Sequence, residues 1–208
     1  MELAVLDKTG KDTGRKVTLS DSVFGIEPNE HTVYLDVKQY LANQRQGTHK
    51  SKERNEVVGS TKKLKKQKGS GAARYGDVKS PIFRGGGRIF GPKPRYYGFK
   101  LNKKVKAVAK KSVLSSSLKE DKLIVLEDLK FDAPKTKDFV AVLKGLDLEG
   151  KRVTLITTEN EKNVYLSSKN VQKVKVVATS EVNTYDLINC SKLVLSESSV
   201  KEIENILS

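Results

Sequence analysis

One segment, residues 45–100, limits what this chain can fold into. Its 56 residues contain 16 Lys and Arg against three acids, so it carries +13 of the chain's net charge of +15. It also holds ten of the 15 glycines but only six Val, Leu or Ile. Ordering a backbone costs about 1–2 kcal/mol per residue, and six scattered aliphatic side chains cannot offset that cost over such a length. We therefore expect this basic arm to lie outside any core and to be ordered only by a polyanion.

Aromatic rings and clustered glycines distinguish the basic arm from a solvated, unstructured insertion, which is the simplest interpretation of a charge run. The aromatic residues are Tyr75, Phe83, Phe90, Tyr96, Tyr97 and Phe99. Such rings are rare in linkers but stack well on unpaired bases. Glycine clusters, such as residues 85–87, let a backbone approach phosphates closely. The pattern predicts nucleic-acid binding.

The other 152 residues have a net charge of only +2 and are numerous enough to build a proper core. Cys190 is the only cysteine, which excludes an intrachain disulfide and fits a reducing compartment. The first residues lack the apolar run of a signal peptide, and no stretch is apolar enough to span a membrane. Glycines and prolines interrupt any basic amphipathic helix, so we expect no membrane partner.

Alternation of apolar runs and amphipathic segments predicts an α/β fold: a mostly parallel sheet flanked by helices, with a long extended basic loop inserted after the first long helix. Strands are expected at residues 2–6, 17–19, 123–126, 153–156, 174–177 and 193–195, and helices at 29–43, 103–119, 134–146, 163–168, 183–188 and 199–207. The expected division is 1–44 and 101–208 as two parts of one globular domain, separated by the arm at 45–100.

Several local details follow from spacing. A turn is expected at 8–14, and N-caps at Asn102 and Asn183. Ser199 and Glu202 have the spacing of a capping box for the last helix. Three helix faces are expected to be apolar or inward-facing: Val33, Val37, Tyr40 and Leu41; Leu101, Val105, Val108, Ala109 and Ser112; and Val200, Ile203, Ile206 and Leu207. Lys103, Lys106 and Lys110 are expected to form an outward basic stripe at the root of the arm.

Signatures of enzymes are missing from the sequence. There is no Walker sequence, no strand–GxGxxG–helix unit and no GxSxG elbow. The two histidines, His31 and His49, lie far apart in the sequence. Glu127 and Asp128 follow a strand, where a ligand site could lie, but loop solvation is the preferred interpretation. We expect no enzyme, no catalytic residue, no metal and no cofactor.

The arm carries short motifs that are specific enough to compare with a known family. They are Arg45-Gln46-Gly47-Thr48, Gly59-Ser60 with Lys62-Lys63, Gln67-Lys68-Gly69-Ser70-Gly71 with Ala73-Arg74, Lys79-Ser80-Pro81, Arg84 with Gly86-Gly87, and Phe90-Gly91-Pro92 with Pro94-Arg95. Lys103-Lys104 and Ala133-Pro134-Lys135-Thr136-Lys137 follow the arm. Over essentially its whole length, the chain resembles the universal large-ribosomal-subunit protein four family in its bacterial form.

That resemblance implies a globular domain on the outside of the large ribosomal subunit and a loop threaded into large-subunit ribosomal RNA, reaching the wall of the peptide exit tunnel. It implies ribosomal RNA, neighbouring large-subunit proteins and the nascent polypeptide as partners, a cytoplasmic location in the ribosome, and no homo-oligomer. The family often has Pro-Trp after the paired lysines, where this chain has Leu64-Lys65, and Ala72 stands where Arg is common. Stacking by that Trp is therefore absent here.

Residue chemistry and the resemblance together give one set of candidate RNA contacts. They are Arg45, Gln46, Thr48, His49, Lys50, Lys52, Arg54, Lys66, Gln67, Lys68, Gly69, Gly71, Arg74, Tyr75, Lys79, Arg84, Gly86, Gly87, Arg88, Phe90, Lys93, Arg95, Lys103, Lys106 and Lys110. Lys62, Lys63, Leu64 and Lys65 are the candidates for the tip at the tunnel. The alternative function is a free nucleic-acid-binding regulator or a DNA-compacting protein with a basic arm.

Overall fold

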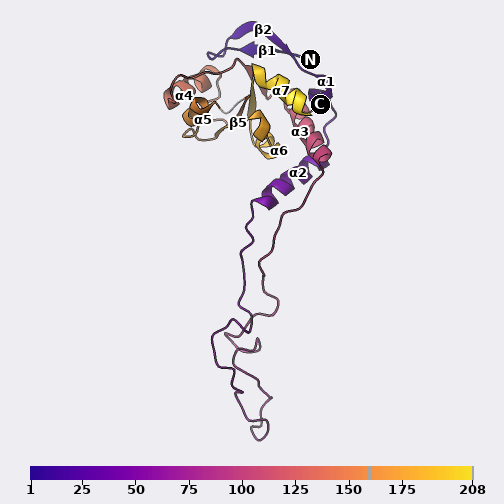
Figure 1. The fold of residues 1–208 in the computed structure, drawn as a ribbon, viewed down its shortest axis with the longest axis vertical. Coiled ribbons are helices and arrows are strands. Elements are labelled where there is room, and N and C mark those ends of the chain that lie inside the picture. The colour runs from indigo at the N-terminus through magenta and orange to yellow at the C-terminus, as the bar shows by residue number, and fades with distance from the viewer. Residues whose placement is uncertain (159–160, 208) are drawn as a thin grey trace. The chain divides into compact units, whose positions relative to one another are not determined.

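A computed structural model describes residues 1–158 and 161–207 (Figure 1). The chain divides into two compact units. One combines Met1–Leu41 with Lys100–Ser208, and the other, the arm unit, is Ala42–Phe99. No helix in the described part of the chain is both long enough and apolar enough to cross a membrane.

A mostly parallel sheet forms the centre of the first unit, which confirms that part of the predicted fold class. Its strands, as far as the chain is described, are β1 (Glu2–Leu6), β2 (Asp12–Thr18), β3 (Leu123–Leu126), β4 (Val153–Thr157), β5 (Val174–Ala178) and β6 (Lys192–Ser196). Their order is β2-β1-β3-β6-β4-β5, and every neighbouring pair is parallel except β1 with β2.

Helices cover both faces of the sheet (Figure 1). The described helices are α1 (Asp21–Phe24), α2 (Glu30–Asn43), α3 (Lys103–Lys119), α4 (Thr136–Gly145), α5 (Lys162–Ser168), the 3-10 helix η1 (Thr179–Glu181), α6 (Thr184–Ile188) and α7 (Glu197–Leu207). Leu193 and Leu195 of β6 pack in one core with α1, α3, α6 and α7. Val194, between them, packs in a second core with α4 and α5. Successive strand residues point to opposite faces, so both faces of β6 are buried.

The first hairpin is tighter than predicted. Strand β2 begins at Asp12, inside the expected 8–14 turn, and the short helix α1 was not predicted. Gly10 has φ +79°, and its N–H donates to the carbonyl of Asp7 at 2.8 Å. The glycine closes the turn within a few residues because it adopts this backbone conformation without a steric penalty.

The predicted apolar face of α2 is confirmed only in part. Val33 packs against the first core and Tyr40 is half-buried, but Leu41 is exposed, and the fully buried residues are Asp36 and Gln39. Asp36 accepts a hydrogen bond from the Thr184 hydroxyl of α6, and Tyr40 stacks on Tyr185 with 5.0 Å between ring centroids. Polar and aromatic contacts with α6 therefore set the orientation of α2, and periodicity alone could not reveal that partner.

Helix α3 has the predicted bounds, but its faces differ from the expectation. Asn102 occupies the N-cap position without a side-chain cap bond. Ala109 and Ser112 are buried as expected, whereas Val108 is exposed. Lys110 is half-buried rather than on an outward stripe, and this burial lowers the pKa of its ammonium group. The buried face follows the contacts with the N-terminal region, where Ser112 Oγ accepts from the backbone N–H of Asn29 at 3.1 Å.

Helix α6 has the predicted cap, since Asn183 Oδ1 accepts from the backbone N–H of Asp186 at 2.8 Å. The capping box predicted for α7 is wrong. That helix begins at Glu197, directly after β6, and the hydroxyl of Ser199 donates to the carbonyl of Ser196 instead. Ile206, expected on the buried face, is 55% exposed. Because the strand runs straight into the helix, there is no loop in which the box could form.

Candidate nucleic-acid interface

Within the arm unit, every residue of which is described, residues 44–99 form neither helix nor strand. Backbone hydrogen bonds nevertheless join its first and second halves. Arg95 N donates to Gly47 O at 3.2 Å, Arg88 N to Lys52 O at 2.9 Å, and Leu64 N to Gly76 O at 3.0 Å. The pairing runs antiparallel, so two limbs, residues 45–64 and 76–99, lie side by side and are joined by an apex at 65–75.

Glycines stand where the limbs approach each other most closely. A Cβ on Gly47, whose φ is +66°, would lie 2.1 Å from the carbonyl oxygen of Arg95. A Cβ on Gly87 would lie 2.4 Å from the backbone nitrogen of Arg54. Neither position accommodates a side chain without moving backbone, so these two glycines set the separation of the limbs.

The apex is open and basic. Gly69 and Gly71 both have positive φ, and a Cβ at either position would meet nothing within 4 Å. Lys65 Nζ lies 5.0 Å from the centre of the Tyr75 ring. Of the predicted tip residues, Lys62 and Lys63 lie on the first limb, Leu64 pairs with Gly76, and Lys65 begins the apex. The turn of the unit thus falls beyond Lys63, around the two glycines.

All three acids of the basic arm form ion pairs within it. Glu53 pairs with Lys93 at 2.5 Å, Asp77 with Arg54 at 3.1 Å, and Glu56 with Lys50. The hydrogen bond from Lys50 lowers the pKa of Glu56, and the one to Glu53 raises the pKa of Lys93. Three predicted RNA contacts (Lys50, Arg54 and Lys93) are therefore engaged inside the unit.

Near the ends of the two limbs, three basic side chains lie around the ring of Tyr97. The guanidinium carbon of Arg45 lies 3.7 Å from the centre of the Tyr97 ring, and that of Arg95 lies 4.5 Å from it. The Tyr97 hydroxyl is 3.0 Å from His49 Nε2. Tyr97 is half-buried, while both arginines and His49 are exposed. The ring thus holds the three side chains together at the surface of the unit.

Comparison with known proteins identifies the family. A model described as the ribosomal protein L4/L1 family matches residues 17–206. The chain belongs to this family. It is 62% identical to large ribosomal subunit protein uL4 of Flavobacterium johnsoniae and 60% identical to that of Cytophaga hutchinsonii. It is 56% identical to that of Bacteroides fragilis. Each comparison covers 100% of both chains.

Membership in the L4/L1 family makes the chain a ribosomal protein and not an enzyme, and it confirms the predicted resemblance. The family match includes the whole arm unit. The candidate residues are therefore expected to act in binding rather than in catalysis.

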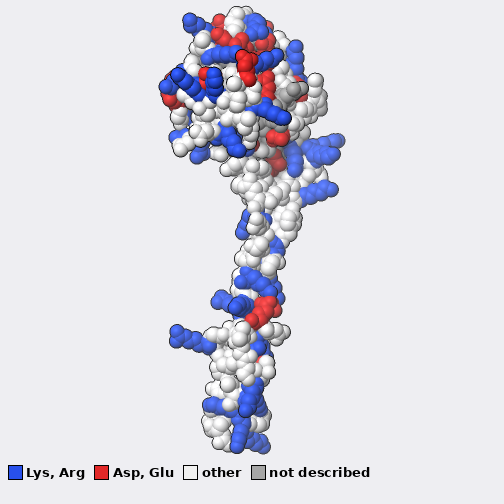
Figure 2. Space-filling model, turned by 60° about the vertical axis from the view of Figure 1, so that its left-hand side comes forward, with Lys and Arg blue, Asp and Glu red and all other residues white. Residues whose placement is uncertain are grey.

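Most of the candidate contacts are exposed, and Figure 2 shows Lys and Arg spread over the surface of the arm unit with few acids between them. Gly87 is buried. Five candidates are half-buried: Tyr75, Lys79, Gly86, Lys106 and Lys110. Tyr75 packs on Phe83, with 5.3 Å between ring centroids. Lys103, Lys106 and Lys110 belong to the other unit, on α3.

Two residues that the candidate set omits have clear roles in the structure. Tyr97 supports the arginines, and Gly47 permits the close crossing of the limbs. Gly47 stands in the motif Arg45-Gln46-Gly47-Thr48, and Tyr97 is one of the aromatic residues of the basic arm. Tyr96, the neighbour of Tyr97, is 80% exposed. Nothing in the sequence distinguishes these two tyrosines, because the difference depends on packing across the limbs.

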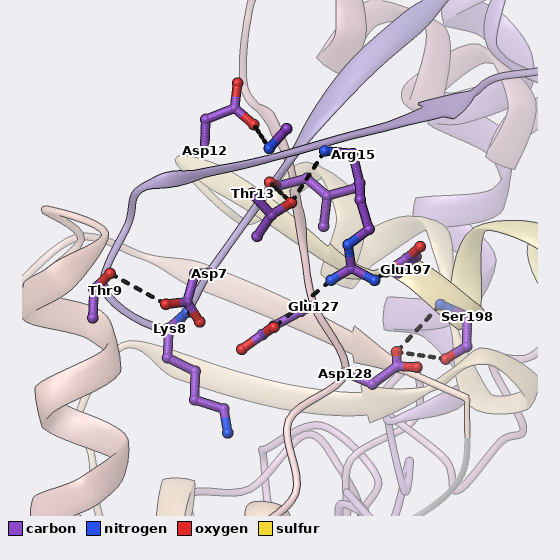
Figure 3. Close-up of polar contacts among 12 residues, drawn as sticks. Asp7, Lys8, Thr9, Asp12, Thr13, Arg15, Glu127, Asp128, Glu197 and Ser198 are labelled. Atoms are coloured by element: carbon purple, nitrogen blue, oxygen red, sulfur yellow. Dashed lines mark hydrogen bonds and ion pairs between the residues drawn. The ribbon is translucent and has the colours of Figure 1, made fainter.

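The acidic pair after β3 has partners that loop solvation did not predict (Figure 3). Arg15 of β2 lies 3.7 Å from Glu127 and 2.9 Å from Glu197. Asp128 Oδ1 accepts from the backbone N–H and the hydroxyl of Ser198 in the first turn of α7. A hydrogen bond with Asp7 raises the pKa of Glu127. Glu127 thus links the end of β3 to β2, and Asp128 links it to α7.

Proposed function

We propose that this chain is a structural constituent of the large ribosomal subunit, where the arm unit binds large-subunit ribosomal RNA and supports assembly. The observation that carries the proposal is the concentration of +13 in residues 45–100. Family membership, and the names of relatives that match over their full length, support the same conclusion.

The chemistry of the arm unit suits folded RNA. Closely packed RNA helices repel one another, and Lys and Arg side chains relieve that repulsion by neutralising phosphates, which also releases bound counterions. Arginine forks onto phosphate or stacks on bases, while lysine acts as a mobile point charge. The three acids are already paired with cations inside the unit, so they place no unpaired negative charge against phosphate. The first unit, with its two packed cores, would anchor the arm.

The proposal also places the arm unit within the ribosome. The apex of the arm unit, with the adjoining Lys62 and Lys63, lines the wall of the peptide exit tunnel and meets the nascent polypeptide. The other partners are neighbouring large-subunit proteins, the location is the cytoplasmic ribosome, and the chain forms no homo-oligomer. The resemblance of the arm motifs supports this placement, as does an apex without acids between Glu56 and Asp77.

Fractionation of cells tests the proposal. An epitope-tagged chain should sediment with large subunits through a sucrose gradient in high salt. A version that lacks residues 46–97, joined by a short Gly-Ser linker, should leave that fraction. Recovery of the intact chain as free protein, or with the nucleoid, would favour the regulator or DNA-compacting function instead.

A further inference from the structure

Two arginines share one aromatic ring in the arm unit, and this arrangement has an electrostatic consequence. Arg45 and Arg95 come from opposite limbs, and both guanidiniums lie within 4.5 Å of the centre of the Tyr97 ring. Because both cations lie near one ring, they also repel each other unless an anion lies near both. Stacking on the ring contributes attraction to each cation, which offsets part of that repulsion.

Neither arginine has a carboxylate partner within the described ranges 1–158 and 161–207. The arm's acids pair with Lys50, Arg54 and Lys93 instead. Arg45 and Arg95 are also exposed, so a ligand in solution can reach them. A stacked guanidinium keeps its in-plane donors available, and those donors match a phosphate group in pairs.

The backbone holds this arrangement in register. Arg95 N donates to Gly47 O at 3.2 Å, which fixes the residue two positions after Arg45 against Arg95 itself. Ring carbons of Tyr97 lie 3.1 Å from the position of a Cβ on Gly47. His49 Nε2 also lies 3.0 Å from the Tyr97 hydroxyl. The site is therefore assembled from both limbs rather than from one run of basic residues.

We propose that Arg45, Arg95 and Tyr97 form a phosphodiester-binding clamp in which Tyr97 is the positioning residue. The ligand is a backbone phosphate of RNA, so the inference rests on the proposed function and names one of its contacts. Tyr97 itself need not touch the RNA. Its ring holds two guanidiniums where both reach one phosphate or two adjacent ones.

A charge-neutral substitution tests the clamp. Binding of the full chain to protein-free large-subunit ribosomal RNA is measured between 50 and 200 mM salt for the wild type, Tyr97→Leu, Tyr97→Phe and the matched control Tyr96→Leu. Each lost phosphate contact makes the slope of log affinity against log salt shallower by roughly one. Tyr97→Leu removes no charge, yet its slope should be shallower by roughly one to two. Tyr97→Phe keeps the ring and should resemble the wild type, as should Tyr96→Leu.

The outcomes separate the clamp from the proposed function. A flat slope for the wild type would count against RNA binding by the arm unit as a whole. A steep wild-type slope that Tyr97→Leu leaves unchanged would overturn the clamp alone. Equal losses in Tyr96→Leu and Tyr97→Leu would also overturn it, because general stacking would then explain both. A loss in Tyr97→Phe as large as in Tyr97→Leu would assign the effect to the hydroxyl and His49, not to the ring.

Discussion

The hydroxyl of Thr184 satisfies a buried carboxylate. Asp36 is 9% exposed on α2 and accepts a hydrogen bond from Thr184 at the start of α6. A buried acceptor that loses its donor pays the desolvation cost of the group, about 1–3 kcal/mol. Thr184→Val should therefore lower the free energy of unfolding by about that amount, as measured by urea denaturation.

Two further variants complete that test. Thr61→Val, at an exposed position, should leave the stability unchanged. The double variant Asp36→Leu/Thr184→Val removes both partners and should recover much of the loss, since replacing both by apolar groups is nearly neutral. A double variant as unstable as the sum of its parts would contradict this account of the bond.

The Asp7–Glu127 contact makes stability depend on pH. Their hydrogen bond raises the pKa of Glu127 above its ordinary value of 4.5 and lowers that of Asp7 below 3.8. Above about pH 4.5, Glu127 therefore holds more protons in the folded state than in the unfolded state. Its contribution to the free energy of unfolding is present below that pH and is lost as the pH rises through the raised pKa. The Asp7 contribution is present above pH 3.8 and is lost as pH falls below it.

Glu127→Gln should therefore flatten the decline in melting temperature above pH 4.5, because the amide does not titrate and still donates to Asp7. The measurement is the melting temperature from pH 4 to 7. Glu27→Gln, at an exposed position, is the control and should follow the wild type. A Glu127→Gln profile parallel to the wild type would mean that the titration of Glu127 does not affect stability.

At the scale of elements, the two units have different sources of order. The first unit has two apolar cores on opposite faces of its sheet. The arm unit has cross-limb backbone bonds, three ion pairs and glycine crossings, with its apolar side chains mostly exposed, such as Val58 and Phe90 at 96%. Hydrogen bonds contribute little net stability in water, and the same holds for ion pairs with an exposed partner, which all three of these have. The stability of the chain should therefore reside in the first unit.

Excision of residues 46–97, with a short Gly-Ser linker between the ends, should leave a folded first unit. None of the removed residues belongs to either core, and closing a shorter loop changes the free energy only slightly. The readout is cooperative thermal unfolding, followed by circular dichroism. In the intact free protein, limited proteolysis should cut first within the arm. Loss of cooperative unfolding in the excised protein would show that the first unit depends on the arm.

At the scale of the whole molecule, charge is concentrated in the basic arm rather than spread evenly. Residues 45–100 carry +13, and the remainder is close to neutral at +2. A near-neutral unit with a packed core and a strongly basic unit without one suit two environments, solvent for the first and RNA for the second. This division is the physical basis for proposing that the apex, and not the first unit, lies against RNA.

A photo-crosslinker at position 63 should capture a stalled nascent peptide on intact ribosomes, because the proposed function places that region at the tunnel wall. One at Lys137, on α4 of the first unit, should not. The readout is the covalent adduct detected on a denaturing gel. Equal labelling from both positions, or labelling from Lys137 alone, would refute the assignment of the tip.

The sequence by itself determined the fold class, most strand and helix bounds, the ribosomal family and the basic arm. These depend on signals within short windows: apolar runs, charge density and motifs of glycine and basic residues. Tertiary structure alone decided which residues come into contact when they lie far apart in the sequence. Asp36 is buried because Thr184, 148 residues away, reaches it. Tyr97, and not Tyr96, supports Arg45 because the limbs pair in one register. Lys110 is half-buried because α3 packs against segments that are distant in the sequence. Such contacts depend on how elements pack, and no local pattern encodes that.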